Sequence, residues 1–277
     1  MTAAKSNTGL ASQLGVRTGK SDKALAVKRN LIVVRAGEDS KHLGWMSSAA
    51  NERSWDLGIS YYGDTEQRYA IDADYYTACK GGKWDGLFDF FTKFADIIDQ
   101  YEYIWLPDDD IETDGAAIEQ LFELAAEHDL QLAQPSLTRS SIYSYGITRN
   151  VPGLTLRRTN FVELMAPLMN RSFFAQALPM FEGRPTGRTL DWVWPKMVDN
   201  RRSQVAIIDG VAVGHYRPLQ KHLWGNLARL GLNPDDEKKL TKQALGARFV
   251  IPQTHGAITA EGNRIGRMGF YLKRLFG

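Results

Sequence analysis

The chain has 277 residues, of which 43% are hydrophobic and 24% charged, the composition of an ordinary globular protein. Its net charge of +2 is too balanced for nucleic acid to be the main partner. The single Cys79 excludes an intrachain disulfide and a cysteine-based zinc cluster, and it fits a reducing cytoplasm. No apolar run approaches the ~20 residues that span a bilayer, and the first residues lack the apolar core of a signal peptide. We therefore expect a cytoplasmic protein.

The first elements predict a parallel crossover unit. Residues 1–28 are small and polar without a sustained apolar period, which predicts a flexible N-terminal arm. Compact apolar runs predict strands at residues 29–35 and 55–62, and Ser40 is placed to cap a helix running to about residue 52. A strand, a helix and a strand at this spacing are typical of two parallel neighbours.

A glycine- and lysine-containing turn follows. A short strand is predicted at residues 75–79 and a helix at residues 86–99, separated by Lys80-Gly81-Gly82-Lys83. Such a turn places backbone N–H groups and ammonium ions where phosphate oxygens bind. It matches neither GxxxxGK[ST] nor GxGxxG, so an ordinary surface turn is the alternative.

The densest motif is a strand followed by three carboxylates. Aromatic and β-branched residues at 101–106 predict a buried strand, which Pro107 ends. Alternate side chains share a face, so Asp108 and Asp110 point one way and Asp109 the other. Ligands bind at the carboxyl ends of strands in open α/β sheets, and paired carboxylates favour a cation such as Mg²⁺ or Mn²⁺. A solvated acidic loop is the alternative.

The remaining elements complete an α/β pattern. We expect helices at residues 115–128 and 170–180, strands at 131–135, 155–165 and 205–213, and a polar loop at 136–152. Strands that alternate with helices predict a mainly parallel sheet with helices on both faces.

Two further patches carry candidate site residues. Asp191 stands beside Trp192 and Trp194, an arrangement typical of sugar sites, where an indole stacks on the ring and a carboxylate meets hydroxyls. The alternative is that both tryptophans lie in the core and that Asp191 caps a helix. His215 follows a buried strand and is a candidate metal ligand, although a lone histidine is more often structural.

Together, these motifs resemble nucleotide-sugar glycosyltransferases of the GT-A type. More narrowly, a poorly characterised family of glycosyltransferase-like proteins resembles the segments RNLIVVRAGEDSKHLGWM, YEYIWLPDDDIETD, FVELMAP and TLDWVWPKM. The resemblance covers roughly residues 29–219. It implies a GT-A-like fold with one catalytic domain at 29–219 and a helical C-terminal extension at 220–277.

The resemblance also implies roles for residues. A divalent ion, Mn²⁺ or Mg²⁺, would be held on the donor diphosphate by Asp108, Asp110 and His215. Asp191 would be the base for the acceptor hydroxyl, with Glu163 as the next candidate. The nucleotide-sugar donor would contact Arg35, Gly37, Glu38, Lys83, Asp109 and Trp192, in addition to Asp108.

The expected activity is transfer of a sugar from a UDP- or GDP-type donor to a hydroxyl acceptor, glycan or lipid-linked, with inversion. A metal-dependent phosphotransferase or phosphatase, in which an aspartate is phosphorylated, is one alternative. A non-catalytic carbohydrate-binding protein is another.

The C-terminal tail has the pattern of a basic amphipathic helix. Residues 264–277 combine four cations with Met268, Phe270, Tyr271, Leu272, Leu275 and Phe276. This pattern predicts a peripheral contact with an anionic membrane, and a helix docked on the domain is the alternative.

Overall fold

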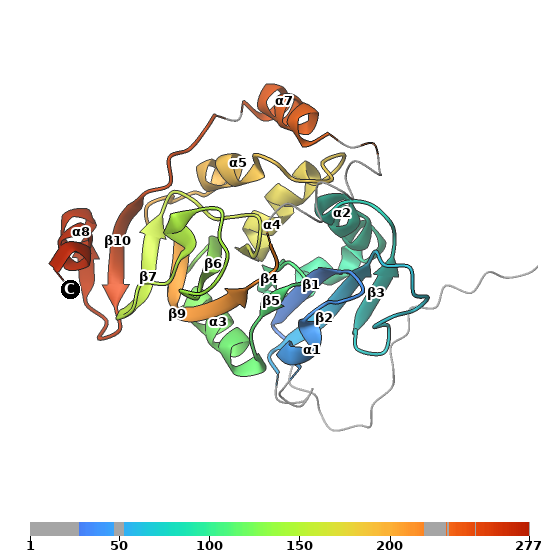
Figure 1. The fold of residues 1–277 in the computed structure, drawn as a ribbon, viewed down its shortest axis with the longest axis horizontal. Helices are drawn as coiled ribbons and strands as arrows, with labels where there is room; N and C mark the ends of the chain where they lie inside the picture. Colours follow the sequence, from blue (N-terminus) through green and yellow to red (C-terminus); the bar gives the residue numbers. More distant parts are fainter. Residues whose placement is uncertain (1–27, 47–52, 219–230, 232, 247, 277) are drawn as a thin grey trace, which may run out of the picture.

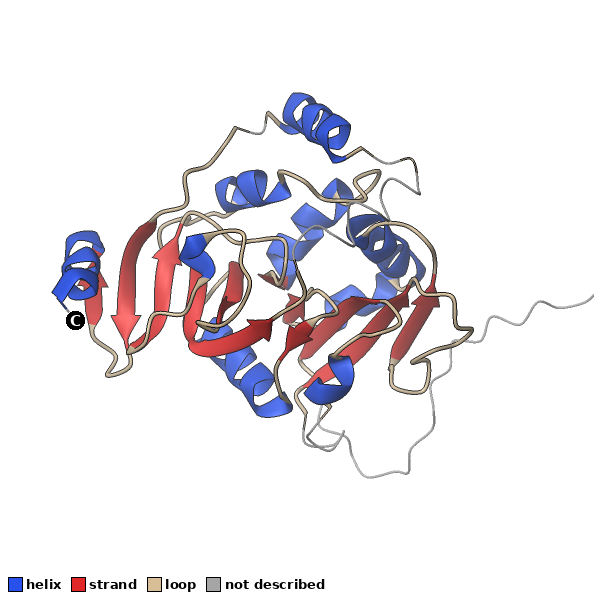
Figure 2. Ribbon diagram, viewed as in Figure 1, coloured by secondary structure: helices blue, strands red, loops and turns tan. Residues whose placement is uncertain are grey.

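An eleven-stranded sheet organises the chain, with helices packed on both of its faces (Figures 1 and 2). The computed structural model describes residues 28–46, 53–218, 231, 233–246 and 248–276. Apart from Lys28, the predicted N-terminal arm lies outside the described residues.

The bounds of the elements are as follows. The strands are β1 (Asn30–Ala36), β2 (Trp55–Tyr61), β3 (Tyr75–Ala78), β4 (Tyr103–Trp105), β5 (Ile111–Glu112), β6 (Leu132–Leu137), β7 (Leu154–Thr159), β8 (Leu168–Asn170), β9 (Val205–His215), β10 (Thr254–Thr259) and β11 (Arg264–Gly266). The α-helices are α1 (His42–Trp45), α2 (Lys83–Lys93), α3 (Gly115–Glu127), α4 (Arg171–Ala177), α5 (Leu190–Met197), α7 (Pro234–Leu245) and α8 (Arg267–Phe276). Short 3₁₀ helices are η1 (Ala95–Gln100), η2 (Gly146–Thr148) and η3 (Leu178–Met180).

The sheet has a parallel half and a mixed half. The strand order is β11-β10-β7-β9-β6-β8-β4-β1-β2-β3, and β5 pairs with β9 outside this path. Strands β3, β2, β1 and β4 are parallel to one another, as are β6 and β9. The other pairs are antiparallel. The predicted α/β fold with helices on both faces is confirmed, and its parallel core is the part that the crossover pattern predicted.

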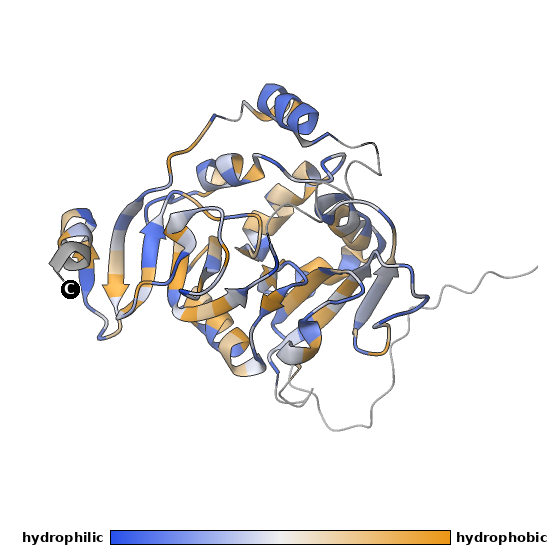
Figure 3. Cartoon of the chain, in the orientation of Figure 1, coloured by the Kyte–Doolittle hydropathy of each residue, from blue (hydrophilic) through white to orange (hydrophobic). Residues whose placement is uncertain are grey.

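Strand β1 shows why helices cover both faces. All seven of its residues are buried, and Leu31 and Val33 pack into one hydrophobic cluster while Ile32 and Val34 pack into another. Successive strand side chains point to opposite faces, so an uninterrupted apolar strand requires a cover on each side. The hydrophobic residues accordingly gather along the central strands (Figure 3).

The cluster that contains Ile32 and Val34 packs under α1 and α3. The cluster that contains Leu31 and Val33 packs under α2, α4 and α5. Helix α3 buries Ile118, Leu121 and Phe122, as its apolar spacing predicted, and Asp114 caps its first turn by accepting a hydrogen bond from the Ala117 N–H at 2.9 Å. A capping carboxylate satisfies one of the N–H groups that a helix start leaves unpaired.

Several boundaries differ from the predictions. Helix α2 begins at Lys83 rather than at residue 86, so the turn residue is also the first helical residue. The predicted strand at 155–165 ends at Thr159, and Glu163 lies in the connection to β8. The predicted helix at 40–52 is seen as α1, and residues 47–52 lie outside the described residues.

The predicted helical extension also contributes strands. Strand β10 pairs with β7, and β11 pairs with β10, so both extend the sheet at its edge. Helix α8 follows them and buries Phe270 against Leu154 and Ala257. Within the described ranges, no helix is long and apolar enough to cross a membrane.

Candidate functional site

The three aspartates lie between the ends of four strands. Parallel pairing aligns β1 with β4, and a bridge between Arg35 and Asp108 continues that alignment past Pro107. Residue Ile111 then pairs with His215 at the end of β9. The chain from Asp108 to Ile111 thus crosses from the parallel half of the sheet to the mixed half, and it brings the acidic cluster to His215.

Asp108 is paired with Lys83. The Lys83 Nζ donates to Asp108 Oδ1 at 2.6 Å and to the carbonyls of Leu164 and Met165 at 2.8 and 3.1 Å. The Lys83 side chain is 15% exposed and that of Asp108 37% exposed, so the pair lies at the opening of the site. Burial raises the pKa of Asp108, which Lys83 opposes and the charge of Asp110 reinforces. The structure therefore places the predicted phosphate-site lysine against the predicted metal-site carboxylate.

Asp110 is paired with His215, the other predicted metal ligand at a strand end. The His215 Nε2 lies 3.3 Å from Asp110 Oδ2, and its Nδ1 lies 2.8 Å from the carbonyl of Ile142. Burial lowers the pKa of His215, but the hydrogen bond and charge of Asp110 outweigh it and raise the pKa to about 9. Burial likewise raises the pKa of Asp110, and the same contacts with His215 bring it below its usual value. The contact with Asp110 therefore favours the protonated imidazole, and Nε2 must lose its proton before it can bind a metal ion.

Asp109 lies with Asp110 in a turn rather than in the predicted extended chain, and it holds the loop after β1. Its Oδ2 accepts the Gly37 N–H at 2.7 Å, and its Oδ1 lies 3.0 Å from a guanidinium nitrogen of Arg217. A side chain at Gly37 would collide with Tyr62, because an added Cβ would stand 2.5 Å from the tyrosine hydroxyl. Asp109 is 6% exposed, so its oxygens face the protein. Asp109 and Gly37 are thus bonded to each other within the chain, and their contact with a nucleotide sugar stays a prediction.

Arg35 forms its hydrogen bonds within the chain, and its contact with the donor stays a prediction. Its side chain is buried, and all five of its N–H groups donate within the chain, to the carbonyls of Ser60, Cys79, Gly81 and Gly82 and to the Ser60 hydroxyl. No donor of Arg35 is left for a nucleoside in this structure. Its charge instead fixes the turn that leads into Lys83, since each carbonyl of that turn points inward.

Glu38 is occupied in the same way. It accepts the hydroxyl of Tyr61 at 2.5 Å and the backbone N–H groups of Asp64 and Thr65 at 2.7 and 2.9 Å. The hydrogen bond from Tyr61, followed by those from Thr65 and Asp64, lowers the pKa of Glu38 to about 2. The predicted nucleoside contact of Glu38 therefore competes with its hold on the loop after β2.

Two buried acids lie beside the aspartate cluster. Asp191 opens α5 and is 4% exposed, and Glu163 is 6% exposed. Burial raises the pKa of each to about 7. The pKa of Glu163 also responds to the charges of Asp191, Asp108 and His215, which shows that the two acids and the strand-end cluster form one electrostatic group.

The surroundings of these acids leave polar atoms unsatisfied. Glu163 Oε2, Asp110 Oδ1 and the hydroxyl of Thr189 are buried without a hydrogen-bond partner among the described residues. Thr189 also adopts a left-handed conformation, with φ of 82°, immediately before α5. Unsatisfied buried groups and left-handed non-glycine residues cost free energy and concentrate at functional sites.

The two tryptophans have separate positions. Trp194 is fully buried and packs edge-to-face on Trp84, with ring centroids 5.1 Å apart. Trp192 is 9% exposed and lies under Phe249, with centroids 5.2 Å apart, and under two lysines of α7. The core alternative thus holds for Trp194. Trp192 is covered by the C-terminal segment, so its face is not open to a sugar in this structure.

Of the three predicted metal ligands, Asp110 and His215 lie together, whereas Asp108 is held by Lys83. Asp110 Oδ1 is an unpaired buried oxygen, and the bond of His215 Nδ1 to a backbone carbonyl leaves Nε2 facing Asp110. A second-shell carbonyl of this kind is usual for metal-binding histidines. Within the described residues, no group of three or more His, Cys, Asp or Glu side chains is arranged to hold a metal ion. Magnesium sites commonly consist of one or two carboxylates completed by substrate phosphates.

Two residues at the site were missed by the sequence reasoning. Arg217 contacts Asp109 at 3.0 Å and Asp110 at 3.6 Å, and its position two residues after His215 on an extended segment was the signal available. Glu237 of α7 accepts the N–H groups of Thr186 and Arg188 at 2.9 and 3.1 Å, and no sequence pattern indicates this contact.

Comparisons with known proteins give distant likenesses. No curated protein matches the chain. The crystal structure of S. aureus TarS 1-349 has a TM-score of 0.44 at 9% identity, over 76% of this chain and 69% of that chain. The complex of the same fragment with UDP-GlcNAc has a TM-score of 0.46 at 9% identity, over 78% and 71%. A197 from STIV has a TM-score of 0.39 at 10% identity, over 86% and 94%. These likenesses are too distant to carry a functional argument.

The family comparison concerns the middle of the chain, from the loop after β2 to the end of β7. Residues 66–160 match the family described as "Protein of unknown function (DUF707)", which confirms the resemblance to an uncharacterised family over that part of the chain.

Proposed function

We propose that the protein transfers a sugar from a nucleoside diphosphate sugar, of the UDP or GDP type, to a hydroxyl acceptor. The observation that carries this proposal is the grouping of a strand-end lysine–carboxylate pair, Lys83 and Asp108, with two buried acids whose pKa values are raised to about 7. Perturbed acids beside a charged pair at the ends of strands are typical of catalytic sites.

The diphosphate would bind at the start of α2. Lys83 is the first residue of that helix, and the N-terminal end of a helix carries a partial positive charge with unpaired N–H groups. Arg35 holds the preceding turn through the carbonyls of Gly81 and Gly82, so the turn is fixed before a ligand arrives. A pre-formed anion site loses less conformational entropy on binding.

A divalent cation, Mg²⁺ or Mn²⁺, would be held by Asp108, Asp110 and His215. When bound, it supplies positive charge to the phosphate oxygens of the leaving group. Lys83 lies at the same carboxylate and adds a second positive charge there.

Asp191 would accept the proton of the attacking hydroxyl. A general base works best when its pKa is near the working pH, and burial raises the pKa of Asp191 to about 7. A single base that activates the acceptor for direct attack inverts the anomeric carbon. Glu163 has a similar pKa and is the second candidate for this role.

Thermal unfolding with nucleotides tests the proposal. UDP or GDP should stabilise the protein in the presence of Mn²⁺ or Mg²⁺, by about 2.7 kcal/mol at ~100 times the dissociation constant. Asp110→Asn should remove the metal-dependent part of this shift. Stabilisation by sugars without any stabilisation by UDP or GDP, with or without metal, would favour a non-catalytic carbohydrate-binding protein. A trapped phospho-aspartate at Asp108 or Asp110 would favour a phosphotransferase or phosphatase.

A further inference from the structure

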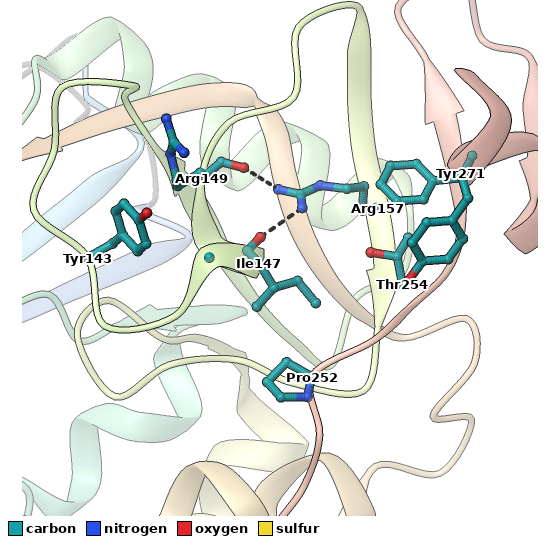
Figure 4. A pocket seen from close by; sticks show the side chains of 9 residues that line it. Tyr143, Ile147, Arg149, Arg157, Pro252, Thr254 and Tyr271 are labelled. Atoms are coloured by element: carbon teal, nitrogen blue, oxygen red, sulfur yellow. Dashed lines mark hydrogen bonds between the residues drawn. The ribbon is translucent and has the colours of Figure 1, made fainter. Parts of the chain in front are cut away.

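A pocket of about 390 Å³ lies on the mixed half of the sheet, between the loop after β6 and the C-terminal segment. Its lining comprises Tyr143, Gly146, Ile147, Arg149, Arg157, Pro252, Thr254, Phe270 and Tyr271 (Figure 4). Its volume falls within the ~300–1,000 Å³ of small-molecule sites. None of the predicted site residues lines it.

The floor of the pocket is rigid. Arg157 is 1% exposed and donates to the carbonyls of Ile147 and Arg149 at 2.7 and 2.8 Å (Figure 4). Its charge is balanced by Asp209, which accepts two of its hydrogen bonds at 2.7 and 2.9 Å. A buried, doubly bonded ion pair holds the loop in one conformation, so the pocket exists before a ligand binds.

The walls offer aromatic faces and a hydrogen-bond donor. Tyr143 is 40% exposed and Tyr271 39% exposed, and in the view of Figure 4 they lie on opposite sides of Ile147. The Arg149 guanidinium stands 5.1 Å from the centroid of the Tyr143 ring. Exposed tyrosines combine a large apolar face with a polar tip, and a guanidinium donates to hydroxyls. This chemistry suits a sugar ring, which has an apolar C–H face and a rim of hydroxyls.

Two chain segments connect the pocket to the candidate base. Tyr145, between the lining residues Tyr143 and Gly146, lies close enough to the Asp191 side chain to oppose the rise in its pKa that burial causes. Phe249, three residues before the lining residue Pro252, packs on Trp192. Each segment thus lines the pocket at one end and contacts the start of α5 at the other.

We propose that this pocket binds a sugar ring of the acceptor. That the bound sugar is the acceptor of the reaction rests on the proposed function, whereas the binding of a sugar ring is inferred from the pocket itself. The acceptor would therefore be a glycan or a glycan-bearing molecule, whose terminal hydroxyl reaches Asp191 while an inner ring occupies the pocket.

Saturation-transfer NMR with the full chain tests the proposal, with the methyl glycosides of glucose, galactose and mannose as probes. At least one of them should bind, and Tyr143→Ala and Tyr271→Ala should each weaken that binding by about tenfold or more, as loss of an aromatic contact residue does. Tyr143→Phe and Tyr271→Phe keep the rings and should keep most of the affinity. Ile71→Ala is the matched control, because Ile71 is an exposed apolar residue, 89% exposed, in the loop between β2 and β3.

UDP and GDP binding is measured on the same samples. If the proposal holds, the alanine variants bind nucleotide like the unmodified chain. If no glycoside binds, or binding survives both alanine substitutions, the pocket is not a sugar site, whatever the nucleotide result. If the alanine variants lose nucleotide binding instead of glycoside binding, the pocket is part of the nucleotide-sugar site and the proposal is overturned. If the unmodified chain binds neither UDP nor GDP, the proposed function is contradicted, but the proposal of a sugar site in this pocket is not.

Discussion

The ammonium of Lys83 and the carboxylate of Asp108 meet at 2.6 Å at the mouth of the candidate site. A second lysine of the same turn, Lys80, pairs with Asp64 at the same distance, but there both side chains are largely exposed, at 61% and 97%. Exposed ion pairs contribute little because water and salt screen them, whereas a charge in a partly buried site acts on a ligand at close range. The two lysines thus form a matched pair for experiment.

We expect Lys83→Met to lower affinity for UDP or GDP by about tenfold or more, the scale of one charge-assisted hydrogen bond. Lys80→Met should leave that affinity unchanged. Isothermal titration calorimetry of both variants measures the difference. Equal losses in the two variants would show that the general positive charge of the turn matters rather than the position of Lys83.

Asp191→Asn should lower turnover by ~10²–10⁴, the usual contribution of a positioned base, with donor affinity nearly unchanged. The substitution keeps the volume of the side chain and removes its basicity. Glu163→Gln is the matched control, since both acids are buried with pKa values raised to about 7. If Glu163→Gln loses turnover and Asp191→Asn does not, the base is Glu163. A product that keeps the donor's anomeric configuration would contradict direct attack.

The raised pKa of Asp191 determines how turnover and stability should depend on pH. The groups that face Asp191 are Tyr145, Arg188 and Glu163. A base must be unprotonated, so kcat/KM should rise with pH through about 7 and then level off. Because the folded chain holds this proton more tightly than the unfolded chain, ionisation destabilises the fold as pH rises above the unfolded value. Asp191→Asn should therefore be more stable than the unmodified chain at pH 8. Measurements of kcat/KM and of the melting temperature from pH 5 to 9 give the two effects separately.

His215→Ala should remove most of the metal-dependent stabilisation by nucleotide. The matched control is His42→Ala, because His42 is also buried, at 0% exposure, and faces a carboxylate, Asp72, at 3.6 Å. His42→Ala should lower the unfolding temperature equally with and without Mn²⁺. If His215→Ala behaves in the same way as His42→Ala, then His215 is a structural partner of Asp110 and not a metal ligand.

Glu237→Gln should lower kcat more than it changes the KM for the donor. The carboxylate accepts the N–H groups of Thr186 and Arg188, and these residues precede Asp191 at the start of α5. The amide keeps one acceptor oxygen, so the loop loses one strong bond, worth about 1.5–3 kcal/mol for a charged acceptor. Asp236→Asn, an exposed neighbour on the same helix, is the control and should change neither constant. A fall in stability with unaltered kinetics would confine Glu237 to a structural role.

Contact of the tail with an anionic membrane is tested on the exposed face of α8. Met268 is 77% exposed and Leu272 49% exposed, one helical turn apart. The double variant Met268→Glu, Leu272→Glu should lose sedimentation with phosphatidylserine vesicles, since each nearby Lys or Arg contributes only ~1 kcal/mol without apolar insertion. Leu240→Glu, on a residue 65% exposed in α7, is the control. Binding that survives the double variant would place the contact elsewhere, and no binding by the unmodified chain would leave α8 as a docked helix.

Local patterns in the sequence are enough to predict the parallel half of the fold and the strand-end cluster. Apolar runs such as residues 29–35 and the helical period of Ile118, Leu121 and Phe122 are local patterns, and burial on one or both faces follows from them directly. The order of strand, proline and three aspartates likewise placed Asp108 and Asp110 at a strand end, where the structure has them. Local patterns are sufficient to predict these features, because hydrophobic periodicity and the end of a strand are both visible in a short stretch of sequence.

The polar groups that remain available to a ligand cannot be identified from local sequence patterns. The resemblance implies that Arg35 and Glu38 bind the nucleotide sugar, but their donors and acceptors are used by carbonyls and N–H groups from residues 60–82. The raised pKa values of Asp191 and Glu163, and the hold of Glu237 on the loop before α5, also depend on burial and on partners distant in the sequence. Satisfaction of polar groups is a property of packing between segments, so no local pattern contains it.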